Sequence, residues 1–123
     1  MNVEENLVFQ LSIGGFPGGW QDFSIIKIKS GYKGKFSKLP DCCECEFPVS
    51  DEDVRALEDC LTRIGAASWL ESYCNFNVLD GIEWNVFCAG KKHSGSNAYP
   101  EGFKELLTFL ADRFGYESLK VIG

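Results

Sequence analysis

Three neighbouring cysteines, Cys42, Cys43 and Cys45, are the residues whose spacing comes closest to metal or redox chemistry. Zinc sites usually contain Cys-x2-Cys pairs at two places in the chain, and a second pair is missing here. The one histidine, His93, is distant in the sequence. We therefore expect no metal and no other cofactor. A small cysteine-cluster module with a metal or redox role is the alternative interpretation.

The other cysteines, Cys60, Cys74 and Cys88, fall on apolar faces of predicted elements, where a free thiol acts as a small hydrophobic side chain. Six cysteines could form a disulfide framework in a secreted protein. However, the N-terminus carries Glu4 and Glu5 where a signal peptide is basic. No apolar run approaches the ~20 residues of a membrane helix. We therefore predict a cytoplasmic protein without a membrane partner.

No combination of side chains predicts a catalytic site. His93 is the sole imidazole base for a cysteine or serine nucleophile, and its segment KKHSGS is typical of a solvated loop. The acids at residues 51–53 are explained by capping of a helix. The segment at residues 94–97 could bind an anion through backbone N–H groups or simply cap a helix. We expect no catalytic residues and a protein that is not an enzyme.

The charges are unevenly distributed along the chain. The net charge is −6, which argues against a nucleic-acid partner because such binding needs a basic surface. Residues 27–38 contain five lysines and no acid, whereas residues 41–59 contain eight acids and one arginine. These segments could be two solvated faces that partly neutralise each other. Alternatively, the acidic segment could attract a basic partner.

Alternating apolar and polar residues predict two antiparallel strands near the N-terminus, at residues 6–13 and 22–30. In the second strand, Ile26 and Ile28 are expected to face inward. A third strand at residues 32–36 is optional, and the cysteine cluster and Pro48 then indicate a loop.

The segment between the first two strands, residues 14–20, contains four glycines and a proline and predicts a loop. It lacks the pattern of a phosphate-binding glycine loop. Phe16 and Trp20 in this segment either cover the edge of the core or form an exposed aromatic anchor for a partner.

A helix is predicted to begin after Ser50 and to end at Gly65. Ser50 is the expected N-cap, and Asp53 stands at the capping-box position. Apolar residues recur at helical spacing, whereas the opposite side is acidic. The apolar positions are Val54, Leu57, Cys60, Leu61 and Ile64.

Residues 72–79 and 82–89 predict a β-hairpin around Asp80 and Gly81. A three-residue loop places Phe76 opposite Trp84 and collects the apolar side chains on one face, whereas a two-residue turn mixes the faces. We therefore prefer the three-residue loop. An exposed sheet edge is expected near Phe36 or Cys88.

Residues 91–98 are polar and contain at most one short edge strand. Pro100 is expected in the first turn of a last helix, which ends at Gly115. Its apolar stripe consists of Phe103, Leu106, Leu107, Leu110 and Phe114. The tail, residues 116–123, is either a short strand or loose.

Together these elements predict a single α+β domain at residues 1–123 in the order β-β-(β)-α-β-β-α. Strand runs punctuated by two helices favour an antiparallel sheet of about four to six strands with both helices on one face.

The motifs DGxxW at residues 80–84 and GSNAYPxxFxxL at residues 95–106 resemble a group of small bacterial α+β proteins. Many members of this group are immunity proteins for polymorphic or contact-dependent toxins. The resemblance implies a non-enzymatic protein that binds and neutralises a cognate bacterial toxin. Binding residues are not carried over, because such proteins vary most in the surface that meets the toxin.

Acidity and small size agree with an immunity protein, since acidic inhibitors commonly meet basic toxins through charge complementarity. We therefore expect a protein partner, a cognate and basic toxin domain. The predicted partner-binding residues are Glu52, Asp53, Glu58, Asp59, Phe16 and Trp20.

Overall fold

Seven strands and two helices follow the order β-β-β-β-α-β-β-β-α in the computed structural model, which describes residues 6–15, 19–39, 43–74 and 81–120. The strands are β1 (Leu7–Gly15), β2 (Gly19–Ile28), β3 (Gly31–Leu39), β4 (Cys43–Val49), β5 (Ser72–Cys74), β6 (Glu83–Cys88) and β7 (Lys91–Ser96). The helices are α1 (Asp51–Arg63) and α2 (Phe103–Phe114), with short 3-10 helices η2 (Ala66–Ser68) and η3 (Glu117–Leu119). The α+β class is confirmed, with more strands than predicted.

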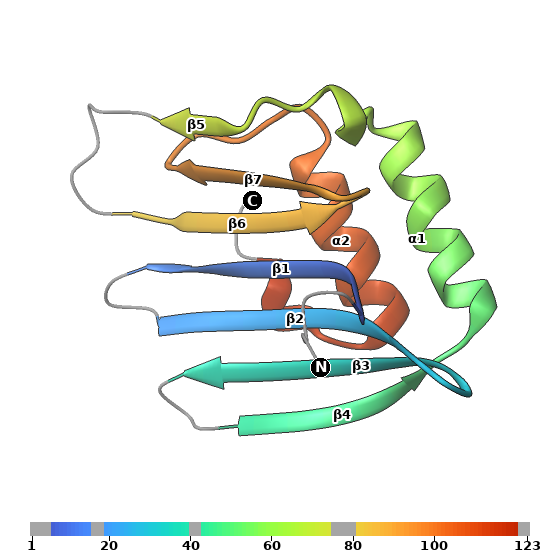
Figure 1. The fold of residues 1–123 in the computed structure, drawn as a ribbon. Helices are drawn as coiled ribbons and strands as arrows, with labels where there is room; N and C mark the ends of the chain where they lie inside the picture. The colour runs from blue at the N-terminus through green and yellow to red at the C-terminus, as the bar shows by residue number, and fades with distance from the viewer. Residues whose placement is uncertain (1–5, 16–18, 40–42, 75–80, 121–123) are drawn as a thin grey trace.

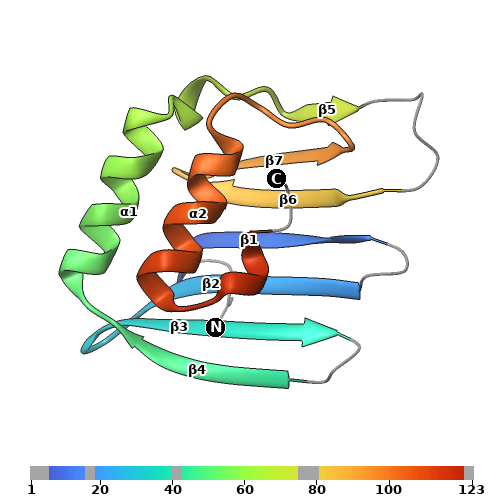
Figure 2. The same cartoon turned by 180° about the vertical axis from the view of Figure 1, so that it is seen from behind.

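All seven strands form one sheet in the order β4-β3-β2-β1-β6-β7-β5. Every neighbouring pair is antiparallel except β5 and β7, which are parallel. Both helices lie on the same side of this sheet, with α1 toward the end where β1 begins (Figures 1 and 2). Among the described residues, no helix covers the opposite face of the sheet.

The core fills the space between the sheet and the helices. Each central strand contributes alternate apolar side chains, and both helices bury the apolar stripes that their spacing predicted. Trp84 is 1% exposed, and its indole N–H donates to the carbonyl oxygen of Ala98 at 2.9 Å. Gly95 on β7 lies directly against this ring, since a Cβ there would come 2.4 Å from Trp84 Nε1. Trp84 is therefore a core residue, as predicted.

The loop between β1 and β2 is shorter than predicted, because both strands extend into the glycine-rich segment at residues 14–20. Gly14 pairs with Trp20, and Gly15 pairs with Gly19. A Cβ on Gly14 would come 2.2 Å from the carbonyl oxygen of Gly19, so glycine here allows the two backbones to approach. Glycines in this segment therefore continue the strands instead of ending them.

The prediction that Ile26 and Ile28 of β2 face inward is wrong. Phe23 and Ile25 are fully buried, whereas Ile26 is half-buried and Ile28 is 38% exposed. The pairing with β1 shifts register between Leu7 and Phe9, opposite this end of β2. Because side chains alternate with a period of two, an error of one residue exchanges the two faces.

The cysteine segment forms strand β4 instead of the predicted loop. It pairs with β3 from Tyr32 opposite Val49 to Lys38 opposite Cys43, so Phe36 does not lie at a sheet edge. Pro48 is compatible with this strand because β4 is an edge strand and has only one partner.

The predicted hairpin between residues 72–79 and 82–89 is also wrong. Strand β6 lies between β1 and β7, where Trp84 is opposite both Ile13 and Gly95. Strand β5 lies at the far edge and pairs with β7. The predicted partner Phe76 and the loop at residues 79–80 fall outside the described residues. Both edges of β6 are occupied, so neither β5 nor a further chain can pair there.

Helix α2 begins three residues later than predicted, at Phe103. Gly102 precedes it with φ +88°, and the N–H of Phe103 donates to the carbonyl oxygen of Pro100 at 3.1 Å. Pro100 thus belongs to the turn before the helix. Gly115 ends the helix in the left-handed conformation at φ +84°, as predicted.

Candidate functional site

The acidic residues predicted to bind a partner all belong to α1, but they lie on two sides of this helix. Glu52, Glu58 and Asp59 are exposed, and in the part of the chain that the structure describes they form no ion pair. Asp53 instead faces α2 and pairs with Arg113. Arg63 pairs with Glu105 on the same side. These exposed acids are spread around the outer arc of α1: Glu58 lies opposite α2, whereas Glu52 and Asp59 lie next to Arg63, nearer to α2.

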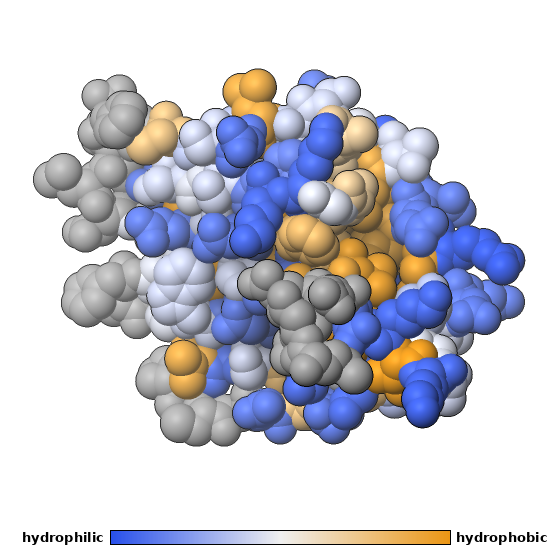
Figure 3. All heavy atoms as spheres, viewed as in Figure 1, coloured by the Kyte–Doolittle hydropathy of each residue, from blue (hydrophilic) through white to orange (hydrophobic). Residues whose placement is uncertain are grey.

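An apolar groove borders this acidic surface. It has a volume of about 490 Å³ and lies between α1, the start of β1 and the turn between β6 and β7. Figure 3 shows apolar side chains gathered between the strand ends and the hydrophilic side chains of α1. The groove is lined by Leu7, Val8, Phe9, Val54, Leu57, Glu58, Leu61, Thr62, Ala66, Ala67, Phe87, Cys88, Ala89 and Gly90.

Small residues keep the mouth of the groove open. Ala67 on η2 and the turn residues Ala89 and Gly90 are exposed and line it. Both turn residues have positive φ, +50° and +76°, which fits a tight link between antiparallel strands. Glu58 is the one charged side chain among the described residues that line the groove. The site therefore combines a hydrophobic hollow with an acidic rim.

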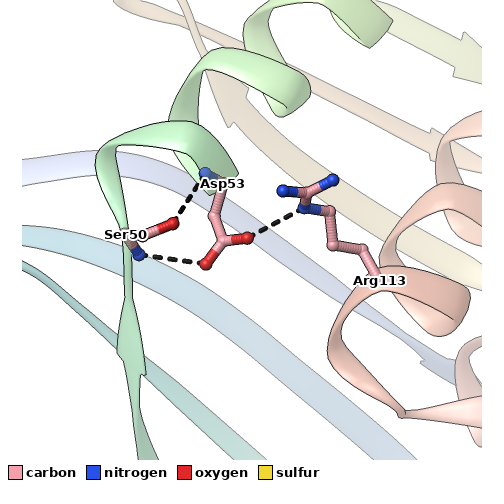
Figure 4. Close-up of polar contacts among 3 residues, drawn as sticks. All are labelled: Ser50, Asp53 and Arg113. Atoms are coloured by element: carbon pink, nitrogen blue, oxygen red, sulfur yellow. Dashed lines mark hydrogen bonds and ion pairs between the residues drawn. The ribbon is translucent and has the colours of Figure 1, made fainter.

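Asp53 serves the structure of the helix. Ser50 and Asp53 form the predicted capping box (Figure 4). The backbone N–H of Asp53 donates to Ser50 Oγ at 3.0 Å, and the backbone N–H of Ser50 donates to Asp53 Oδ2 at 2.9 Å. On the other side of the carboxylate, Arg113 Nε donates to Asp53 Oδ1 at 2.8 Å. Burial raises the pKa of Asp53, but the hydrogen bonds from the Ser50 backbone and Arg113 outweigh burial and leave the pKa below its ordinary value. These contacts occupy both carboxylate oxygens.

Trp20, one of the two aromatic residues of the predicted site, is not among the residues that line this groove. Trp20 is half-buried on β2 and lies against Gly14, near the end of β1. The groove contacts Leu7, at the start of the same strand. Phe16 falls outside the described residues. The structure therefore separates Trp20 from the acidic surface by almost the whole length of β1.

The lysines of residues 27–38 and the acids of residues 41–59 partly neutralise each other, but they do so between β3 and β4 and not at α1. Glu46 on β4 lies 3.0 Å from Lys33 Nζ and 3.7 Å from Lys35 Nζ, both on β3. The hydrogen bond from Lys33 lowers the pKa of Glu46. This pairing accounts for one acid of the segment and leaves the exposed acids of α1 unpaired.

His93 is buried, which contradicts its predicted place in a solvated loop. It is 4% exposed on β7, with Nδ1 2.9 Å from the carbonyl oxygen of Leu70 and its ring edge against Trp69. Strand β7 pairs on both sides, with β6 and with β5, so it is not the predicted edge strand. His93 therefore joins β7 to the segment before β5.

The cysteines are only partly as predicted. Cys60 and Cys88 are buried, and burial raises the pKa of both thiols, whereas Cys74 is exposed. Cys45 lies with Sγ 3.2 Å from the Tyr116 hydroxyl oxygen. Among the described residues there is no group of three or more His, Cys, Asp or Glu that could hold a metal ion. Cys42 lies outside them.

The helix-free face carries a second, polar hollow of about 660 Å³. Cross-strand partners there form a polar row, in which the Ser12 hydroxyl donates to the Asp22 carboxylate. The remaining members of this row are Glu44, Ser37, Asn85, Ser94 and Ser72. The row contains two acids, Asp22 and Glu44, and its other members are neutral side chains that can both donate and accept hydrogen bonds.

The sequence indicated the acidic residues but not the groove. The groove joins three segments that are far apart in the chain, and the sequence indicated only one of its walls, through the apolar stripe of α1.

Comparisons with protein-family models, with curated proteins and with solved structures find no match to this chain. No helix within the described ranges is long and apolar enough to cross a membrane.

Proposed function

We propose that this chain is an immunity-type protein that binds and neutralises a basic toxin domain without catalysing a reaction. The observation that carries the proposal is the unpaired acidic surface of α1 beside an apolar groove. An apolar centre with a charged rim is the arrangement found in many specific protein interfaces.

The charges of α1 support a basic partner. Its exposed side carries Asp51, Glu52, Glu58 and Asp59 against Arg55, in a chain whose net charge is −6. Charge of one sign on the binding surface raises the rate of encounter with a partner of the opposite sign and disfavours partners of the same sign. The resemblance of the DGxxW and GSNAYP motifs to immunity proteins points to the same class of partner.

Co-expression with the product of the adjacent gene tests the proposal. We expect the two proteins to purify as a complex, and we expect this chain to relieve the growth defect that the other product causes. A neighbouring product that is neither toxic nor bound would overturn the proposal.

A charge-reversed variant locates the surface. Replacement of Glu52, Glu58 and Asp59 by lysine should lower the association rate constant by about tenfold or more, because electrostatic steering is lost. The matched control reverses three exposed acids of other elements, Glu71, Glu83 and Glu101, and so produces the same net charge. An equal loss in both variants would indicate an effect of net charge alone.

A further inference from the structure

Resting on the proposed function, we infer that the groove beside α1 is the anchor site for the toxin. It would receive an apolar side chain that is flanked in the toxin by lysine or arginine. The groove volume of about 490 Å³ lies within the range of about 300–1,000 Å³ that is typical of binding pockets.

The geometry of α1 places one acid, Glu58, at the edge of the groove. Successive residues of an α-helix are 100° apart, so Glu58 projects between the groove wall at Leu61 and the outer side of the helix. Glu52 and Asp59 lie about 100–120° further around the helix, beyond Arg55 and toward α2. A partner side chain in the groove would thus bring its neighbours directly over Glu58.

As far as the structure describes it, the opposite wall of the groove has no charged side chain. It consists of β1, η2 and the β6–β7 turn, whose lining residues are all apolar or glycine. An apolar side chain can therefore lose its contact with water on this side, while a basic group beside it can lie near Glu58. Central, desolvated anchors surrounded by a polar rim contribute most of the affinity of protein interfaces.

The sign of the rim also distinguishes a toxin segment from a lipid. A fatty acid would fit an apolar groove of this size, but a carboxylate at its α1 edge would meet the like charge of Glu58. Like charges repel, whereas a lysine or arginine beside an apolar residue of the partner is attracted to Glu58. The charge of the rim thus favours a basic partner segment as the occupant.

The direct test narrows the mouth of the groove. Ala67 is exposed and lines the groove, whereas its neighbour Ser68 is exposed and does not line it. Ala67→Phe should weaken toxin binding at least tenfold, mainly through faster dissociation, because the anchor is displaced. Ser68→Phe adds the same side chain one position away and should bind within twofold of the wild type.

Hydrogen exchange of the unmodified chain provides a second readout, which does not depend on the folding of a variant. Toxin binding should slow amide exchange at Leu61, Thr62, Ala89 and Gly90 and leave that of Trp20 unchanged. A complex that forms without this protection, or with equal affinity for Ala67→Phe, would overturn the groove inference and leave the immunity function intact.

A wild-type chain that does not bind the toxin would refute the proposed function, and the groove inference with it. Myristate serves as the lipid probe. If the wild-type chain binds myristate and the toxin does not displace it, the groove belongs to a lipid ligand and the inference is wrong.

Discussion

Replacement of Asp53 by alanine tests whether this residue stabilises the fold, because its carboxylate joins α1 to α2. The substitution removes the acceptor for the Ser50 backbone N–H, at 2.9 Å, and for Arg113 Nε, at 2.8 Å. It leaves the Ser50 hydroxyl bond to the backbone N–H of residue 53 intact. We therefore expect a loss of stability with little change in the fold.

The expected size follows from these two contacts. A hydrogen bond of this kind contributes about 0.5–1.5 kcal/mol to the free energy of unfolding. The Asp53 and Arg113 side chains are 23% and 36% exposed, so their ion pair adds only about 0.2–1 kcal/mol. Together, Asp53→Ala should cost about 1.5 kcal/mol, which lowers Tm by about 6 °C in a domain of this size.

Urea unfolding at neutral pH measures this loss. Asp51→Ala is the matched control, since Asp51 occupies the same helical turn, is exposed and makes no such contacts in the described part of the chain. It should cost about 0.5 kcal/mol through the helix dipole. A double-mutant cycle with Arg113→Ala isolates the ion pair. If Asp53→Ala costs no more than Asp51→Ala, the structural role of Asp53 is refuted.

The contribution of Asp53 also depends on pH. Its pKa in the folded protein is below the ordinary value of about 3.9, so the ionised carboxylate favours folding. This stability is fully present above about pH 4 and is lost as the pH falls through the lower pKa of the folded state. The difference between wild type and Asp53→Ala should therefore shrink in acid.

One further substitution and one chemical modification test the packing of the core. Gly95→Ala should cost about 1–3 kcal/mol in urea unfolding, because its Cβ would come 2.4 Å from Trp84 Nε1; a neutral effect would contradict the close packing. Iodoacetamide should modify Cys74 in the folded protein but spare Cys60 and Cys88, whose burial raises the thiol pKa. Peptide mass mapping measures this, and rapid native labelling of Cys88 would contradict the fold.

Local features of the fold could be predicted from the sequence because a few adjacent residues determine them. Ser50 and Asp53 are three residues apart, which is the spacing that a capping box requires, and the structure contains that box. Gly115 adopts the left-handed conformation that ends α2. The apolar stripes of both helices are likewise local patterns, and both are buried.

The order of strands could not be predicted in the same way, because pairing joins residues that are far apart in the chain. Residues 72–74 are close in sequence to β6, but β6 already has β1 and β7 as partners. The turn at Gly81 therefore does not determine which strands pair. The strand at Cys43–Val49 was mistaken for a loop because Pro48 suggested a break, and an edge strand tolerates proline.

The predicted binding residues do not form one surface, because Trp20 and the groove are too far apart for a single interface of standard size. Leu7 lines the groove and Gly14 pairs with Trp20. At about 3.4 Å per residue these two positions of β1 are about 24 Å apart. A standard interface buries about 800 Å² per partner, so a round patch extends about 16 Å from its centre. An interface centred on the groove therefore includes Glu58 and leaves Trp20 outside, where its ring packs against Gly14.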